Sequence, residues 1–156
     1  MLTQVSGEAI ALSAPTRVAI VASNYNQKYV NALVAGAQSI FESHSPVSSK
    51  VIRVPGAFEI PAVAAKCASD SPERFDAILC FGVVLQGATS HAEVIVEAVS
   101  RGLIDLQIRY RIPVVHGVYH FENEAVAAER CLDPSNNRGQ ECGRVALEMT
   151  EVMRQL

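Results

Sequence analysis

The hydrophobic residues of this chain gather in four runs that do not alternate with polar residues. The runs are RVAIVAS at 17–23, KVIRV at 50–54, AILCFGVVL at 77–85 and IPVVHGVY at 112–119. A strand shows such a run when both of its faces are buried, because both rows of side chains then contact apolar groups. The pattern therefore predicts four strands that are covered on both sides.

Helical periodicity occupies the segments between these runs. After Asn26, which suits the N-cap position, apolar side chains recur every three or four residues, at Tyr29, Val30, Leu33, Val34, Ala37, Ile40 and Phe41. Further helices are predicted over 59–69, 90–107 and 123–130, and from 142 to 156. Strands that alternate with helices indicate a parallel sheet with helices on both faces.

The first 14 residues do not fit this alternation. Their stretch EAIALS, at 8–13, has the composition of a strand, but no helix follows it. It is compatible with a strand that pairs with a neighbouring chain, and disorder is the alternative. We therefore expect a tail over 1–14 and one α/β domain over 15–156.

The loop QGATSH, at 86–91, has the features of an anion site at the carboxyl edge of the sheet, where parallel sheets bind ligands. Ser90 and Glu93 have the spacing of a capping box, which predicts a helix that starts at Ser90 and holds His91 in its first turn. Unpaired N–H groups and the helix dipole favour a bound phosphate there, and Gly87 and Ala88 leave the approach open. Similar turns also occur without a ligand.

His91 and Arg130 are the candidate catalytic residues. The helix dipole disfavours protonated His91 and a bound phosphate favours it, so the ring is suited to take and give a proton near neutral pH. Arg130 ends AVAAER, on a loop expected at the same edge, where a guanidinium is suited to clamp a phosphate. The alternative for His91 is a solvated histidine without a catalytic role, and the alternative for Arg130 is a surface salt bridge.

Other polar and aromatic residues follow the predicted strands. Tyr25 is placed to stack on a planar ring or to pack against apolar neighbours. Glu59 is placed to accept hydrogen bonds from hydroxyl or ring N–H groups, or to stabilise the start of a helix. His116 and His120 are expected on one face of the fourth strand, and two imidazoles without a third ligand make a poor metal site.

Composition narrows the class of protein. The chain has 156 residues and a net charge of −3, and its Lys and Arg residues form no cluster, which argues against nucleic-acid binding. No apolar stretch reaches the roughly 18 residues that span a bilayer, and the N-terminus does not resemble a signal peptide, so we expect a cytoplasmic protein. The four cysteines suggest neither a zinc site nor a disulfide framework; Cys67 and Cys80 are expected in the core, and Cys131 remains open as a reactive thiol.

The chain resembles the lumazine synthase family over nearly its whole length, through VAIVASNYN, LVAGA, VPGAFEIP, FDAILCFGVVLQGATSH, IPVVHGV, AVAAER and NNRG. The resemblance implies a flavodoxin-like three-layer α/β/α sandwich around a four-stranded parallel sheet. It also implies a transferase of riboflavin biosynthesis that needs no cofactor or metal. Such an enzyme condenses 5-amino-6-(D-ribitylamino)uracil with 3,4-dihydroxy-2-butanone 4-phosphate to 6,7-dimethyl-8-ribityllumazine, phosphate and water.

The resemblance also assigns roles to residues. It implies proton transfer by His91 and a phosphate site formed by Arg130 with Ala88 and Thr89. The residues expected to contact the substrates are Tyr25, Asn26, Ala57, Phe58, Glu59, Val83, Val84, Leu85, Ala88, Thr89, His116 and Arg138. The pocket of the family lies between subunits of a pentamer, which in some members builds an icosahedral shell, so His116 and the N-terminal tail would reach a neighbouring chain. Riboflavin synthase is the expected protein partner.

Three positions depart from the usual pattern of the family. Gln86 stands where an arginine is common, His116 where an aromatic residue packs on the substrate, and Arg138 where a lysine is frequent. We therefore expect activity with altered affinity. The alternatives are a flavin-binding, lumazine-binding or shell protein that has lost catalysis and, more weakly, a flavodoxin-like electron carrier, whose first loop would be richer in Ser, Thr and Gly than SNYNQ.

Overall fold

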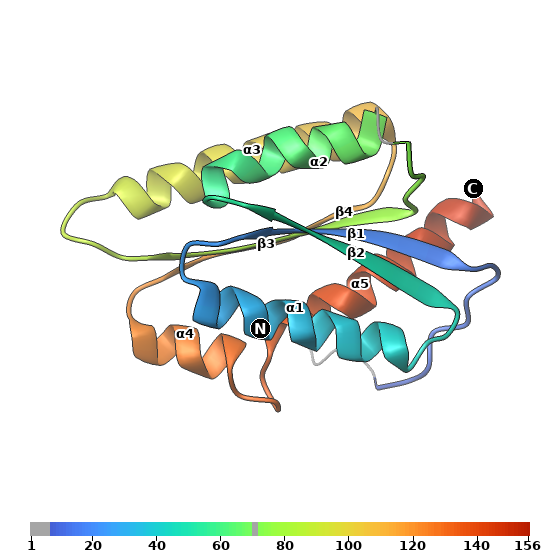
Figure 1. Ribbon diagram of the computed structural model, residues 1–156, viewed down its shortest axis with the longest axis horizontal. Helices are drawn as coiled ribbons and strands as arrows, with labels where there is room; N and C mark the ends of the chain where they lie inside the picture. The colour runs from blue at the N-terminus through green and yellow to red at the C-terminus, as the bar shows by residue number, and fades with distance from the viewer. Residues whose placement is uncertain (1–6, 70–71) are drawn as a thin grey trace.

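The computed structural model describes residues 7–69 and 72–156. They form three layers, in which one parallel sheet lies between two layers of helices. The strands are β1 (Thr16–Ser23), β2 (Val47–Val54), β3 (Ala77–Leu85) and β4 (Val114–Phe121), in the order β2-β1-β3-β4. The helices are α1 (Gln27–Glu42), α2 (Ile60–Ser69), α3 (His91–Tyr110), α4 (Glu124–Cys131) and α5 (Arg138–Gln155), and a short 3-10 turn, η1 (Ala57–Glu59), precedes α2. Helices α2 and α3 cover one face, and α1, α4 and α5 cover the other (Figure 1). The predicted α/β architecture is confirmed.

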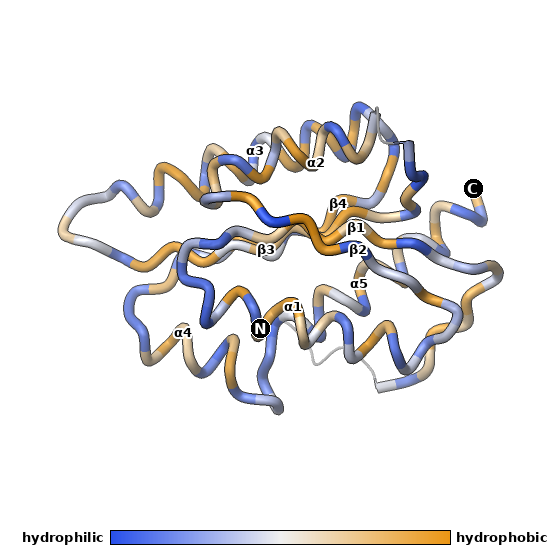
Figure 2. The backbone as a smooth tube through the Cα atoms, in the orientation of Figure 1, coloured by the Kyte–Doolittle hydropathy of each residue, from blue (hydrophilic) through white to orange (hydrophobic). Residues whose placement is uncertain are grey.

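The central strands β1 and β3 carry the core on both faces. Ile20, Leu79 and Phe81 pack with the α1, α4 and α5 side, whereas Ile78 and Cys80 pack with the α2 and α3 side. Hydrophobic residues follow the strands through the middle of the sheet (Figure 2). The unbroken apolar runs at 17–23 and 77–85 therefore report correctly on strands that are buried on both sides.

Strand β2 differs from the prediction, because it is an edge strand and only its last residue, Val54, is buried. It begins at Val47 rather than at Lys50. Its charged side chains reach solvent-facing partners, with Lys50 Nζ 2.7 Å from Glu73 Oε1 and Arg53 Nη2 2.7 Å from Asn31 Oδ1. An edge strand has a neighbour on one side only, so the predicted burial of its residues on both faces was wrong.

Two other predicted boundaries shift for local reasons. Strand β4 runs from Val114 to Phe121 rather than over 112–119; Pro113 has no N–H to donate, and its carbonyl oxygen accepts from Ile78 N at 2.8 Å. Helix α5 begins four residues before Cys142, because Asn137 caps it. The first turn of α5 is polar, and hydrophobic periodicity therefore does not report it.

The N-terminal segment lies along α5 of its own chain. Arg144 Nη2 donates to the Glu8 carbonyl oxygen at 2.6 Å, and Ser13 N donates to Glu151 Oε2 at 3.1 Å. Ile10 packs against the core on the α1 and α5 side. Within residues 7–15 the backbone forms no strand with this chain's own sheet, and the first part of the expected tail, 1–6, lies outside the described residues. Pairing of the tail with a neighbouring chain stays a prediction.

All four cysteines are buried and unpaired. Cys67 and Cys80 lie in the core, as predicted. Cys131 is fully buried, and burial raises the pKa of its thiol to about 12. It is therefore not the reactive thiol that its position beside Arg130 left open, because the thiolate is the reactive form. None of the described helices has the length and apolar character needed to cross a membrane.

Candidate active site

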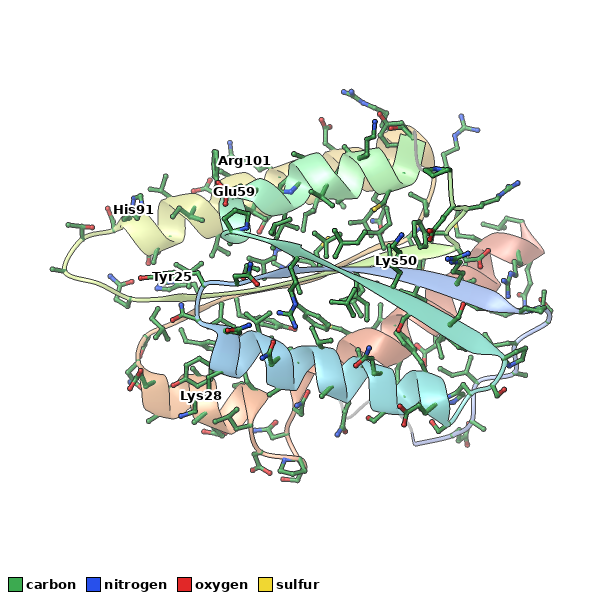
Figure 3. The ribbon with its side chains drawn as sticks, viewed as in Figure 1. Tyr25, Lys28, Lys50, Glu59, His91 and Arg101 are labelled. Atoms are coloured by element: carbon green, nitrogen blue, oxygen red, sulfur yellow. The ribbon has the colours of Figure 1, made fainter. Side chains whose placement is uncertain are left out.

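Backbone hydrogen bonds draw the loops after β1 and β2 together at the carboxyl edge of the sheet. Asn24 N donates to the Val54 carbonyl oxygen at 2.8 Å, and Tyr25 N donates to the Pro55 carbonyl oxygen at 3.1 Å. Tyr25, Glu59 and His91 accordingly lie at the same end of the sheet (Figure 3). The edge predicted to bind a ligand is therefore built from residues far apart in the sequence.

Asn26 connects this edge to the central strand rather than capping α1 with its side chain. Its backbone adopts the left-handed conformation, at φ 55° and ψ 41°, which asparagine tolerates better than most residues. No side-chain cap bond forms; instead Nδ2 donates to the Val83 carbonyl oxygen at 2.7 Å. Asn26 is the N-cap residue of α1, as predicted, but its side chain does not cap the helix, because it bonds to β3 instead.

The predicted substrate-contacting residues of these loops differ in exposure. Tyr25 and Phe58 are 73% and 64% exposed, which is unusual for large aromatic residues and suits contact with a planar ligand or another chain. Ala57 and Val83 are buried, and Val84 and Leu85 are half-buried. Glu59 Oε2 accepts from Gly56 N at 2.9 Å, so this exposed carboxylate also stabilises the start of η1.

The junction between β3 and α3 is open to solvent. Residues 86–91 are all exposed, and α3 begins at His91, which confirms the prediction that His91 lies in the first turn. The predicted capping box does not form. The backbone of Ser90, at φ −73° and ψ 12°, is not extended, and its side chain makes no cap bond. His91 N instead donates to Thr89 Oγ1 at 3.4 Å. Of the amides that open the helix, that of His91 is thus bonded within the loop, and the next residue, Ala92, is buried.

Arg130 lies on the other side of the sheet from this junction. It occupies the last turn of α4 rather than the predicted loop, and α4 covers the face opposite α3 (Figure 1). Its Nη1 donates to Asn136 Oδ1 at 3.3 Å. Arg130 lines an open cavity of about 520 Å³ together with His116, Tyr119, Arg138 and Glu141. Among the described residues, neither of the two cavities that Arg130 lines includes Ala88, Thr89 or His91.

Two histidines of β4 have partners that sequence reasoning did not find. His116 Nε2 lies 2.6 Å from Ser100 Oγ of α3, and partial burial lowers the pKa of His116. His120 Nε2 lies 2.6 Å from Gln86 Oε1. The only sequence signal for the contact between His120 and Gln86 was that Gln86 stands where an arginine is expected. Among the described residues, no group of three or more His, Cys, Asp and Glu side chains has the arrangement of a metal site.

Comparison with known proteins decides the family. A family model described as 6,7-dimethyl-8-ribityllumazine synthase matches residues 15–154. Two curated proteins of the same name, from Thermococcus kodakarensis and Thermococcus gammatolerans, are each 34% identical over 140 residues. The matches cover 90% of this chain and 88% and 89% of the relatives. The chain belongs to the 6,7-dimethyl-8-ribityllumazine synthase family. This is a family of transferases in riboflavin biosynthesis, and the resemblance read from the sequence is confirmed.

The residues expected to serve a lumazine synthase therefore form two groups on one chain. The first group lies at the carboxyl edge and comprises Tyr25, Asn26, Ala57, Phe58, Glu59, Val83, Val84, Leu85, Ala88, Thr89 and His91. The second group, His116, Arg130 and Arg138, lines the cavity beside β4 and α5. The guanidinium of Arg138 pairs with Glu141 in the first turn of α5. Each group carries part of the expected chemistry.

Proposed function

We propose that this protein condenses 5-amino-6-(D-ribitylamino)uracil with 3,4-dihydroxy-2-butanone 4-phosphate to form 6,7-dimethyl-8-ribityllumazine, phosphate and water. The observation that carries the proposal is the exposed start of α3, where His91 opens the helix two residues after Thr89 and three after Ala88. Membership of the family supports it independently. The helix amides hold the phosphate, and the imidazole stands beside the reacting atoms.

The reaction requires proton transfer and the positioning of both substrates. The amine of the pyrimidine condenses with the ketone to an imine and releases one water, phosphate then leaves by elimination, and ring closure with loss of a second water completes the product. His91 takes and gives protons in these steps, a role that suits a ring between a helix dipole and a phosphate. Tyr25 stacks on the pyrimidine, and residues 57–59 and 83–85 line the place where the pyrimidine and its ribityl chain lie. Holding both substrates in register lowers the entropic part of the barrier.

A second subunit completes this site in our proposal. Arg130 lies in α4, which covers the face of the sheet opposite α3, and this placement favours an Arg130 from another chain as the partner of a phosphate at Thr89. The cavity that holds Arg130, His116 and Arg138 is open, and it offers these groups to a neighbouring copy. A ring of subunits, such as the expected pentamer, makes every site from two adjacent chains.

The test is to mix the purified protein with both substrates and to follow lumazine absorbance. A rate above the uncatalysed background supports the proposal, and its absence rejects it. His116 and Gln86 also leave room for a second function, the binding of a flavin or lumazine without catalysis. Titration with riboflavin beside the rate assay separates the two, because a pure binding protein would bind riboflavin and show no turnover.

A further inference from the structure

We propose that Gln86 and His120 are positioning residues that hold the loop 86–91 in its phosphate-binding shape. The inference rests on the proposed function and assigns a role to a side-chain pair that spans the end of β3 and the end of β4. The pair touches the loop and not the reacting atoms. Its effect on the reaction would therefore come through the direction of the loop's backbone groups.

The Gln86 amide uses both of its ends. Its Nε2 donates to the carbonyl oxygens of Gly87 and Thr89, each at 3.1 Å. Its Oε1 is 2.6 Å from His120 Nε2. Since the amide nitrogen is the donor to two carbonyls, the oxygen is the acceptor, and His120 Nε2 carries the hydrogen. Gln86 is thus bonded to the loop on one side and to the edge strand on the other.

The strand ends beneath the loop are joined in the same place. Gln86 N donates to the Phe121 carbonyl oxygen at 2.9 Å, next to His120 in the sequence. The side-chain bond therefore extends the pairing of β3 and β4 by one more connection. A loop that contains a glycine loses much conformational entropy when it is ordered, and bonds to a strand end offset that cost.

The carbonyl contacts decide where two backbone donors point. In a trans peptide the carbonyl and the following N–H lie in one plane and point in opposite directions. With the Gly87 carbonyl turned toward Gln86, the N–H of Ala88 points away from it. The Thr89 carbonyl has the same effect on the N–H of Ser90. Gln86 thereby aims two N–H groups away from itself, beside the opening amides of α3, as an oxyanion requires.

Glutamine suits this position because it both donates and accepts. An alanine at 86 would release both carbonyls, whereas an arginine would still donate to them but could not accept from His120. The variants Gln86→Ala and Gln86→Arg therefore separate the two halves of the contact. In His120→Ala the glutamine loses its anchor on β4 and keeps only its bonds within the loop.

The first experiment reads the loop directly. Hydrogen–deuterium exchange over 86–91 is compared in the wild type, Gln86→Ala, His120→Ala, the double variant and the control Gln155→Ala, which changes an exposed glutamine near the end of α5. We expect the His91 N–H, which donates to Thr89 Oγ1, to exchange about three- to tenfold faster in Gln86→Ala, because the loop then loses the three side-chain bonds of Gln86 and opens more often. The control and the rest of the sheet should not change. Unchanged exchange at 86–91 would overturn the proposal.

The second experiment uses the reaction. We expect Gln86→Ala to raise the KM of the phosphorylated ketone about three- to tenfold, while the KM of the pyrimidine stays within about twofold. The double variant should be no worse than Gln86→Ala alone, since His120 acts through Gln86. Equal changes for both substrates, or additive effects in the double variant, would also overturn it. If the wild type lacks activity, the proposed function fails. The exchange experiment, with and without inorganic phosphate, still tests whether Gln86 and His120 hold the loop 86–91.

Discussion

The side chain of Asn137 joins the start of α5 to α1, because its Nδ2 donates to the Ala32 carbonyl oxygen 3.0 Å away. The same nitrogen donates to the Cys131 carbonyl oxygen at 2.7 Å, and Oδ1 accepts from Gly139 N at 2.7 Å. One asparagine therefore caps a helix and satisfies carbonyls of two other helices. The position of Arg138, the next residue, depends on it.

Replacement of Asn137 should therefore cost more than the loss of an ordinary cap. We expect Asn137→Ala to lower the free energy of unfolding by about 2–4 kcal/mol, the sum of a lost N-cap and of carbonyls left without their donor. Urea-induced unfolding at one fixed protein concentration measures it. The matched control is Asn136→Ala, whose side chain bonds to the side chains of Glu129 and Arg130 rather than to backbone carbonyls. Equal losses in the two variants would contradict the interpretation.

Two glycine-to-alanine substitutions should have effects of opposite sign. A Cβ at Gly139 would lie 2.0 Å from the Leu33 carbonyl oxygen, so α5 must move away from α1. A Cβ at Gly102 of α3 would meet Pro61 Cβ at an ordinary 3.4 Å. We expect Gly139→Ala to destabilise the fold by more than about 2 kcal/mol, and Gly102→Ala to stabilise it by about 0.5–1 kcal/mol through helix propensity. Thermal unfolding of both variants reads the sign directly.

His91 should affect turnover more than binding. We expect His91→Ala to lower kcat by about 100-fold or more, the usual contribution of a general acid or base. The dissociation constant of the pyrimidine should stay within about threefold, since the imidazole is not its binding platform. The control is His44→Ala, whose ring bonds to the Ile40 carbonyl oxygen at 2.7 Å near the end of α1. Unchanged turnover in His91→Ala would remove this residue from the mechanism.

A site made by two subunits predicts complementation between inactive variants. His91→Ala and Arg130→Ala should each be nearly inactive alone. When they are coassembled in equal amounts, about a quarter of the sites combine an intact His91 with an intact Arg130 from the neighbour, and that share of activity should return. Absence of recovery in verified mixed assemblies would place both residues in the site of a single chain.

His116 should make stability depend on pH. Partial burial lowers its folded-state pKa below 6.5, so the unfolded chain binds a proton more readily as the pH falls through 6.5. The contribution of His116 is therefore intact above that pH and is lost as the pH falls toward the folded-state pKa. Urea unfolding at pH 7.5 and at pH 5.5 should show a smaller loss in His116→Phe than in the wild type. An equal loss in both would assign the pH dependence to other groups.

Local sequence determined much of the architecture. The apolar runs at 17–23 and 77–85 predicted the two central strands, because a strand buried on both faces must be apolar in both side-chain rows. The stripe from Tyr29 to Phe41 predicted α1 for a similar reason. The motifs around 86–91 led to the family and to the position of His91 in the first turn of α3. These properties depend on neighbours in the chain, and a sequence displays them directly.

Tertiary structure alone decided which residues meet across the fold. The order of the strands placed β2 at an edge and exposed residues that its apolar composition predicted to be buried. It also put Arg130 and His91 on opposite faces of the sheet, and it joined Gln86 to His120, 34 residues further along the chain. Such relationships depend on how the layers pack and on where buried polar groups find partners. Hydrophobic periodicity carries no information about either, because it records burial and not the identity of the neighbour.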